Sequence, residues 1–349
     1  MIATATGIFE ARLREVLTRR LGEDVATLVA LPPGGNNSLW KAVTTSGRPL
    51  LVKRYAVRAG DNRDRLGSEL GALGFLWRAG VRCIPEPLLG DPDERVGVFA
   101  LVEGAPVRRD EVCPADVSAA ADFLVLLQRL TGRPEASALP QASEAIFAPA
   151  GYREVIERRR AALAAVVCRA EEGLARFLRE DFARLHDEAE RFARAEACRR
   201  GVPWEGELDQ AWRTLSPSDF GFHNALRRPD GTLVFVDFEY FGWDDPAKAV
   251  ADVLHHPAAG VPPPLRAPFV EAVVRGFPRE AAVADRLAVA YHLAGVNWCL
   301  IVLNPFLRRE EGGPDAANLC RERLAAARER AGRLRQELRT RTFPPGGEQ

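Results

Sequence analysis

The chain has 349 residues, 47% of them hydrophobic and 28% charged, which exceeds the usual size of one compact domain, so two lobes are expected. Lys plus Arg and Asp plus Glu both number 48, which leaves no net charge to attract nucleic acid or an anionic membrane surface. The N-terminus lacks a basic region followed by a long apolar core, and no run of 18 uncharged apolar residues is apparent. We therefore expect a cytoplasmic protein without a nucleic-acid or membrane partner.

The first hundred residues alternate between helical and extended patterns. Residues 8–22 place apolar side chains at helical spacing and end in Gly22, which predicts an amphipathic helix. A second helix is predicted over residues 64–80. Short runs rich in Val, Leu and Thr, divided by turn clusters, predict antiparallel strands at residues 25–31, 39–45, 49–55 and 97–104. A sheet and one helix would form a small first lobe.

The rest of the chain has mainly helical periodicity. Pro114 suits a helix start, and residues 151–200 predict two or three packed helices. The strand pattern at residues 233–239 follows a turn and pairs with residues 224–226 in a predicted hairpin. A basic helix closes the chain at residues 320–341; a solvated face is its default interpretation, and an anionic partner is the alternative. The predicted organisation is α+β, with a lobe at 1–102, a helical lobe at 103–342 and a disordered tail at 343–349.

Two segments of the helical half carry residue types suited to phosphoryl transfer: LSPSDFGFHNAL (215–226) and VFVDFEYFGWDDP (234–246). Asp219 lies where Pro217 and glycine disfavour regular structure, so its carboxylate can face a cleft and act as a general base. Asn224 and Asp237 offer oxygen ligands for a hard cation, and the hairpin can bring them together. Each residue type also stabilises turns, so the ordered set, and no single member, indicates function.

Lysine is rare in this sequence. Of the 48 cationic residues only Lys41, Lys53 and Lys248 are lysine, so a lysine that persists against the bias is a candidate for a chemical role. An ammonium is a compact point charge, which suits a phosphate site.

The spacing D-x-x-x-x-N, followed by a hairpin and a strand-terminal Asp, resembles the catalytic and metal loops of the protein-kinase-like phosphotransferases. The two segments are similar to the aminoglycoside phosphotransferase and choline kinase branch, which phosphorylates small molecules. This resemblance, from about residue 24 to 310, implies a two-lobed protein-kinase-like fold that uses ATP and Mg²⁺. It implies Asp219 as the base, Asn224 and Asp237 as the metal ligands, Lys53 on the nucleotide phosphates and Glu69 as its partner.

The same resemblance implies two further nucleotide contacts. The backbone of Ala100 and Val102, in the segment that joins the lobes, would bond adenine. A phosphate-covering turn between the first two strands would comprise Gly34, Gly35, Asn36, Asn37 and Ser38.

Three positions depart from the family pattern. Pro217 stands where kinases have a largely architectural His. Glu239 stands where protein kinases have the glycine of D-F-G, which argues against a protein kinase and offers a further carboxylate near the metal. Ala249 stands where a second Asp is common, and Asp252 can substitute one turn later.

Several interpretations stay open from sequence alone. His255 and His256 are expected to be structural, because neighbouring helical residues diverge and no matching ligand is spaced to join them. Tyr240 and Trp243 belong either to the acceptor pocket or to the core, and His223 is assigned to packing more readily than to phosphate.

The acceptor is expected to be a sugar, an amino alcohol, an amino acid or an aminoglycoside. For a polycationic drug, Glu239, Asp244, Asp245 and Asp252 could supply an acidic pocket. The alternative function is a nucleotide-binding pseudokinase that acts as a scaffold. The oligomeric state is not predicted.

Overall fold

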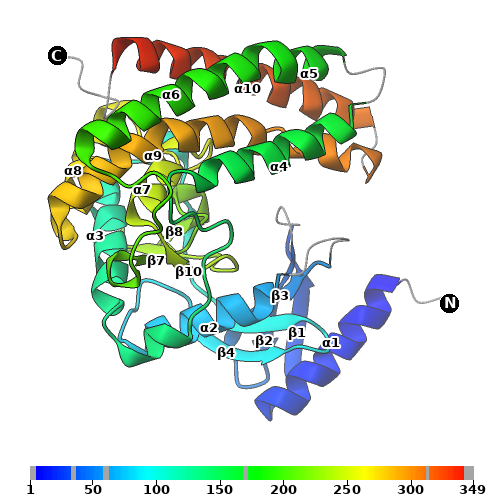
Figure 1. Ribbon diagram of the computed structural model, residues 1–349. Helices are drawn as coiled ribbons and strands as arrows, with labels where there is room; N and C mark the ends of the chain where they lie inside the picture. The colour runs from blue at the N-terminus through cyan, green and yellow to red at the C-terminus, as the bar shows by residue number, and fades with distance from the viewer. Residues whose placement is uncertain (1–4, 33–36, 58–62, 168–171, 312–313, 342–349) are drawn as a thin grey trace. The chain divides into compact units, whose positions relative to one another are not determined.

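A computed structural model of the chain describes residues 5–32, 37–57, 63–167, 172–311 and 314–341. The chain divides into two compact units, which we call the sheet unit and the helical unit (Figure 1). The sheet unit comprises Met1–Val107, Gly132–Pro140 and Asn224–Gly242. The helical unit comprises Arg108–Thr131, Gln141–His223 and Trp243–Gln349. The tail predicted to be disordered lies outside the described residues.

An antiparallel sheet of five strands dominates the sheet unit, with spatial order β1-β2-β3-β5-β4. In chain order the strands are β1 (Val25–Ala30), β2 (Asn37–Thr44), β3 (Pro49–Tyr55), β4 (Pro87–Asp91) and β5 (Val96–Ala100). The three predicted N-terminal strands are confirmed. The strand predicted at 97–104 ends at Ala100, although the Leu101 N–H still donates a 3.3 Å hydrogen bond to the Pro49 carbonyl of β3. Strand β4 was missed because its sequence, PLLGD, contains a proline and a glycine, which are poor strand formers.

Side-chain alternation gives this sheet two different faces. Leu50 and Val52 of β3 are buried on one face, against Leu13 and Leu17 of helix α1 (Ala5–Leu21). Gly22 ends α1 with φ +76°, a conformation that favours glycine. The intervening residues of β3, among them Lys53, point to the opposite face. Strand β3 therefore anchors the hydrophobic core and carries Lys53, the lysine predicted to bind phosphates.

Helix α2 (Arg65–Arg78) packs on strands β4 and β5 and begins at Asp64, whose carboxylate accepts a hydrogen bond from the Gly67 N–H. A second sheet of the same unit has the order β6-β8-β9. Its strands are β6 (Ala105–Pro106), β8 (Ala225–Arg227) and β9 (Leu233–Phe235). The predicted hairpin is confirmed, because β8 and β9 pair antiparallel with Ala225 opposite Phe235.

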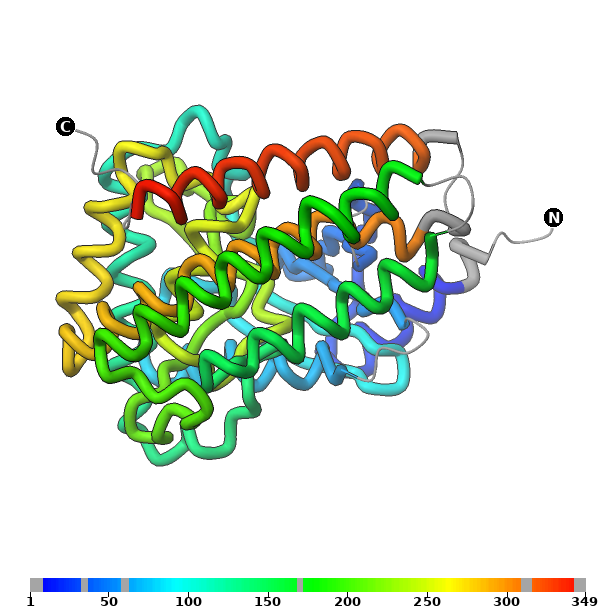
Figure 2. Tube along the Cα trace, turned by 45° about the horizontal axis from the view of Figure 1, so that its top comes forward, coloured from blue at the N-terminus to red at the C-terminus, as the bar shows by residue number. Residues whose placement is uncertain are grey.

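The helical unit is built around helix α9 (Glu280–Ile301). Helices α4, α6 and α10 run side by side across the unit, and each contacts α9 (Figures 1 and 2). Besides α9, the helices and strands assigned here to this unit are, in chain order, α3 (Pro114–Leu130), α4 (Gly151–Ala165), α5 (Glu172–Arg176), α6 (Ala183–Arg200), β7 (Thr214–Ser216), β10 (Gly242–Asp244), α7 (Pro246–His255), α8 (Arg266–Gly276) and α10 (Pro314–Thr340). The two short strands β7 and β10 pair with each other.

One segment, Glu280–Arg308, is long and apolar enough to cross a membrane by length and composition alone. Sequence inspection missed it because His292 and Asn297 interrupt the apolar run. In the structure 89% of its apolar window is buried inside the protein, as expected for the central helix of a folded core. The segment is therefore weak evidence for a membrane span, and the cytoplasmic location stays a prediction.

His292 of α9 provides a test of this core. Its side chain is buried, and neither ring nitrogen has a hydrogen-bond partner among the described residues. Burial lowers the pKa of His292 from 6.5 to about 4. Between pH 6.5 and pH 4 the unfolded chain therefore binds a proton at His292 that the folded chain does not bind. As the pH falls over this range, the difference lowers the free energy of unfolding by about 3 kcal/mol.

The His292→Phe variant keeps a ring in the same space. We expect its free energy of unfolding to fall by about 3 kcal/mol less than that of the wild type over this pH range. Urea unfolding at pH 7.5 and pH 4 measures the difference. An equal loss in both proteins would contradict the assignment of acid sensitivity to His292.

The predicted fold class, an antiparallel sheet lobe followed by a mainly helical lobe, is confirmed. The contact-based division groups the hairpin and residues 132–140 with the sheet unit, whereas the predicted ranges divide the chain once, after residue 102. The predicted boundaries stay a prediction.

Candidate active site

In the sheet unit, Lys53 stands at the centre of a cluster of carboxylates. Its Nζ atom lies 2.7 Å from Oε2 of Glu69, 2.6 Å from Oδ1 of Asp237 and 3.6 Å from Oε2 of Glu239. Lys53, Glu69 and Glu239 are buried, whereas the Asp237 side chain is 37% exposed. The predicted contact between Lys53 and Glu69 is therefore present, and the cluster opens toward solvent at Asp237.

Strand alternation and helix placement explain how the cluster forms. Lys53 and Tyr55 share one face of β3, and the Tyr55 hydroxyl donates a 2.6 Å hydrogen bond to Oε2 of Glu69. Glu69 lies on the buried side of α2, and its Oε1 atom accepts a 3.2 Å bond from the Phe238 N–H. Tyr55 was not predicted, although its period-two spacing from Lys53 was a usable signal.

The charges in this cluster are strongly coupled. Burial alone would lower the pKa of Lys53, but the carboxylates of Glu69, Asp237 and Glu239 outweigh it and raise that pKa above its ordinary value. Burial and the neighbouring negative charges raise the pKa of Asp237, against the pull of Lys53. The three carboxylates outnumber Lys53 and Arg65, which leaves negative charge that a further cation can neutralise. One oxygen from each carboxylate lies within 4.8 Å of the others.

Glu239 is the most enclosed member of the cluster. Asn37 donates a 2.8 Å hydrogen bond to Oε2 of Glu239, and Nη1 of Arg65 lies 3.4 Å from Oε1. Asn37 and Ser38, predicted in the phosphate-covering turn, form the first two residues of strand β2, and their contact with phosphate stays a prediction. Gly34, Gly35 and Asn36, the remainder of that turn, lie outside the described residues.

The hairpin brings the two predicted metal ligands to one end. Since Ala225 pairs with Phe235, Asn224 falls opposite Val236, whose N–H donates a 2.9 Å bond to the Asn224 carbonyl. Asp237 follows directly with φ +69°, an unusual conformation for a residue other than glycine. The backbone therefore places Asn224 and Asp237 beside each other in the fold.

The Lys53 face of the sheet continues toward the segment after β5. Leu39 pairs directly with Lys53, and Leu51 lies two residues before it, so both half-buried leucines share its face. The Ala100 N–H donates to the Glu86 carbonyl at 2.9 Å. The Val102 N–H, by contrast, has no hydrogen-bond partner within the described part of the chain. Val102 thus offers a free donor, whereas the N–H of Ala100 is already used.

In the helical unit, Asp219 lies between two histidines. Its Oδ1 atom is 3.1 Å from Nε2 of His223 and 3.3 Å from Nε2 of His256. The imidazole rings stack with centroids 4.2 Å apart and an interplanar angle of 6°. In the tautomer protonated at Nε2, each ring can donate to Asp219. The expectation that His256 has no matching partner is wrong, because the loop after α7 brings it to Asp219.

Backbone contacts hold the Asp219 segment in an irregular conformation. Ser218, directly before Asp219, has φ +67°, and its N–H donates to the Ser216 hydroxyl at 3.0 Å. The Phe222 N–H donates to the Ala259 carbonyl at 2.9 Å. A Cβ atom on Gly221 would lie 2.5 Å from Cα of Ala259, so this close approach requires glycine.

A series of contacts among Trp298, Asp252 and Lys248 supports the position of His256. Trp298 meets the His256 ring edge-on at 4.6 Å, and its Nε1–H donates a 2.8 Å bond to Asp252. Lys248 then bridges Asp252 at 2.7 Å and Asp244 at 3.0 Å. Burial and the charge of His223 lower the pKa of His256 to about 4, so its ring is neutral at pH 7. Asp252 therefore belongs to a network that supports the Asp219 cluster.

Comparisons with known proteins place the chain in a family. A family model described as "Phosphotransferase enzyme family" matches residues 27–285, well over half of the sequence, and the chain belongs to this family. The predicted enzyme class, a small-molecule kinase, is confirmed. No curated protein matches the chain in sequence.

Solved structures share the fold at low sequence identity. Choline kinase LicA from Streptococcus pneumoniae is 17% identical with a TM-score of 0.61, covering 93% of this chain and 99% of that one. A choline/ethanolamine kinase family protein from Mesorhizobium loti is 19% identical with a TM-score of 0.63, covering 95% and 99%. Spectinomycin phosphotransferase APH(9)-Ia, solved with ADP and spectinomycin, is 14% identical with a TM-score of 0.65, covering 93% and 98%.

Proposed function

We propose that the protein transfers the γ-phosphoryl group of ATP to a hydroxyl group of a small molecule, with the assistance of Mg²⁺. The observation that carries this proposal is the buried ammonium of Lys53, held among three carboxylates of which Asp237 is partly exposed. A family of phosphotransferases requires a cation for the phosphates and oxygen ligands for a metal, and this cluster contains both. The spectinomycin phosphotransferase solved with ADP supports an adenine nucleotide as the donor.

The sheet unit supplies the groups suited to the nucleotide. Lys53 would neutralise phosphate charge, and its salt bridge with Glu69 would hold the ammonium in place. Leu39 and Leu51 offer apolar surface to the purine on the same face. The Val102 N–H would donate to the adenine edge, while a contribution from Ala100 would have to come from its carbonyl.

The donor set around Asp237 fits Mg²⁺, which prefers oxygen ligands. The Asp237 carboxylate and the Asn224 side-chain carbonyl would hold the ion, and Glu239 adds negative charge nearby. When bound, the ion would neutralise charge on the phosphates. The charges that raise the pKa of Asp237 would be partly compensated, so the carboxylate would stay ionised at neutral pH.

Asp219 would act as the general base. A carboxylate with a hydrogen-bonded oxygen and a side chain 34% exposed can orient an incoming hydroxyl group and accept its proton. The two imidazole contacts would restrict the rotation of this carboxylate, and the neutral state of His256 would avoid an ion pair that weakens the base.

Thermal unfolding with ATP, with and without Mg²⁺, tests the metal assignment. We expect Mg-ATP to raise the melting temperature of the wild type more than ATP alone does, because a ligand that binds only the folded state stabilises it. Asp237→Ala should abolish the difference between ATP and Mg-ATP. Asp230→Ala, at the exposed turn of the same hairpin, is the matched control and should keep the difference. An unchanged Mg²⁺ dependence in Asp237→Ala would contradict the assignment.

A further inference from the structure

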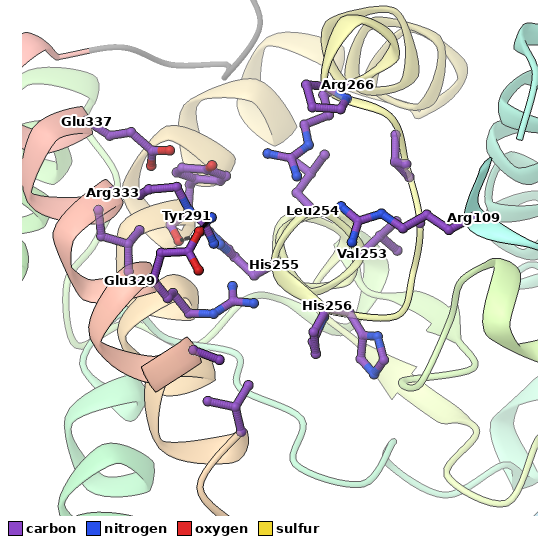
Figure 3. A pocket seen from close by; sticks show the side chains of 18 of the residues that line it. Arg109, Val253, Leu254, His255, His256, Arg266, Tyr291, Glu329, Arg333 and Glu337 are labelled. Atoms are coloured by element: carbon purple, nitrogen blue, oxygen red, sulfur yellow. Dashed lines mark hydrogen bonds and ion pairs between the residues drawn. The ribbon is translucent and has the colours of Figure 1, made fainter. Parts of the chain in front are cut away.

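The helical unit contains an arginine-lined cavity of about 480 Å³. Its volume falls in the range of small-molecule sites. Side chains reach it from opposite sides, with Arg109 and Arg266 facing Glu329 and Arg333 of α10 (Figure 3). Five arginines and only two glutamates line it: Arg109, Arg266, Arg323, Arg330 and Arg333, with Glu329 and Glu337. A chain without net charge therefore concentrates three excess positive charges here.

Direct ion pairs are few among these arginines, although the Glu337 carboxylate interacts electrostatically with Arg266, Arg330 and Arg333. Glu329 pairs with Arg333 at 2.6 Å. The side chains of the other four have no ion pair or hydrogen bond among the described residues. Nε of Arg266 is buried without a partner, and burial lowers the pKa of Arg330. A desolvated guanidinium without a partner is costly, and an anion would remove that cost.

The cavity borders the proposed base. His256 lines it, and the same residue contacts Asp219 at 3.3 Å. His255 and Tyr291 line the neighbouring wall, where Nε2 of His255 meets the Tyr291 carbonyl at 2.9 Å. A ligand that contacts His256 in this cavity would therefore be separated from Asp219 by that one side chain.

Three of the acidic residues that could have selected a cationic acceptor are held in ion pairs within the helical unit. Asp244 and Asp252 share the ammonium of Lys248. Asp245 forms an ion pair with Arg286 and accepts a hydrogen bond from the Ala247 N–H. The ion pairs with Lys248 and Arg286 make these carboxylates less available to a cationic acceptor.

We propose that the arginine-lined cavity binds an oxyanion, and that this oxyanion is part of the acceptor, which makes the acceptor an anionic hydroxyl compound. The identity of the acceptor rests on the proposed function, whereas the binding of an oxyanion does not. Arg266 and Arg330 form its main contacts, because a guanidinium matches the geometry of carboxylate and phosphate oxygens.

Inorganic phosphate tests the cavity without nucleotide. Titrated at constant ionic strength, phosphate should bind the wild type more tightly than chloride does, as followed by calorimetry. Arg330→Gln and Arg266→Gln should each weaken phosphate binding at least tenfold. Arg321→Gln, an exposed position of α10 outside the cavity, should bind as the wild type does. Melting temperatures near that of the wild type would show that the variants are folded.

Equal phosphate binding in Arg330→Gln and Arg266→Gln, or none in the wild type, would overturn the cavity assignment. The acceptor is tested separately by passing a host metabolite extract over an anion-exchange resin before incubation with γ-labelled ATP. Label should enter a compound of the retained fraction, and acceptor activity confined to the unretained fraction would overturn the anionic acceptor. Prior phosphatase treatment of the retained fraction should destroy a phosphomonoester acceptor and spare a carboxylate.

Label in neither fraction would contradict the proposed function. The phosphate result would then still decide whether the cavity binds an oxyanion, so the two failures are distinguishable.

Discussion

Replacing Asp219 with asparagine is expected to slow phosphoryl transfer by about 10²–10⁴-fold, the usual contribution of a positioned general base. The amide oxygen of asparagine can still accept hydrogen bonds from His223 and His256, so the local structure should persist. Nucleotide affinity should change little, because Lys53 and Asp237 belong to a different cluster. Steady-state kinetics and calorimetry with Mg-ATP measure the two quantities separately.

Asp209→Asn provides the matched control for this variant. Asp209 caps a short helical turn of the same unit through a 2.9 Å bond from the Ala211 N–H, outside the Asp219 cluster. Its replacement should leave turnover within about twofold of the wild type. Full activity in Asp219→Asn would exclude Asp219 as the base.

Replacing Lys53 with methionine is expected to cost both nucleotide affinity and stability. The ammonium is the centre of the cluster formed by Glu69, Asp237 and Glu239, and removing one partner of a buried ion pair destabilises a protein by about 3–5 kcal/mol. The remaining carboxylates would repel one another. The pKa of Asp237, already raised, would rise further, so the folded state would bind a proton that the unfolded state releases.

The stability deficit of Lys53→Met should therefore shrink as the pH falls from 7 toward 5, in the opposite direction to the acid loss predicted for His292. Lys41→Met is the matched control, because Lys41 is exposed on the neighbouring strand β2. It should change the unfolding free energy by less than about 0.5 kcal/mol. Equal denaturant midpoints for the two variants would contradict the central place of Lys53.

The elements predicted correctly from sequence share a strong local pattern. Strands β1, β2 and β3 are short runs rich in Val, Leu and Thr that lie between turn clusters, and α1 ends at a glycine in the left-handed region. The paired strands β7 and β10 have three residues each, too few for a periodic signal. Local sequence therefore identified the regular elements, and tertiary pairing determined the short ones.

The same distinction applies to the candidate site. The contact between Lys53 and Glu69 was predicted from a strand, a following helix and a family resemblance. The contact between His256 and Asp219 was not predicted, because it depends on where the loop after α7 passes. Its supports, Trp298 and Lys248, approach from other turns and another helix, so spacing along the chain carries no signal for them.

The arginine-lined cavity illustrates a further limit of sequence reasoning. The terminal helix was assigned a solvated basic face, and most of its arginines are indeed exposed. Arg330 differs because it turns toward α9 and the loop after α7, where burial lowers its pKa. Composition shows that the helix is basic, but only packing separates the arginines that face water from those that line a cavity.

Phosphoryl transfer by this protein is tested directly by the transfer of label from γ-labelled ATP into a host metabolite extract, with Mg²⁺ present and Asp219→Asn as the parallel sample. We expect one labelled small molecule with the wild type and at least a hundredfold less label with Asp219→Asn. Mass analysis of that compound would identify the acceptor. An absence of labelled product, in a preparation that Mg-ATP stabilises against heat, would contradict the kinase assignment and favour a nucleotide-binding scaffold.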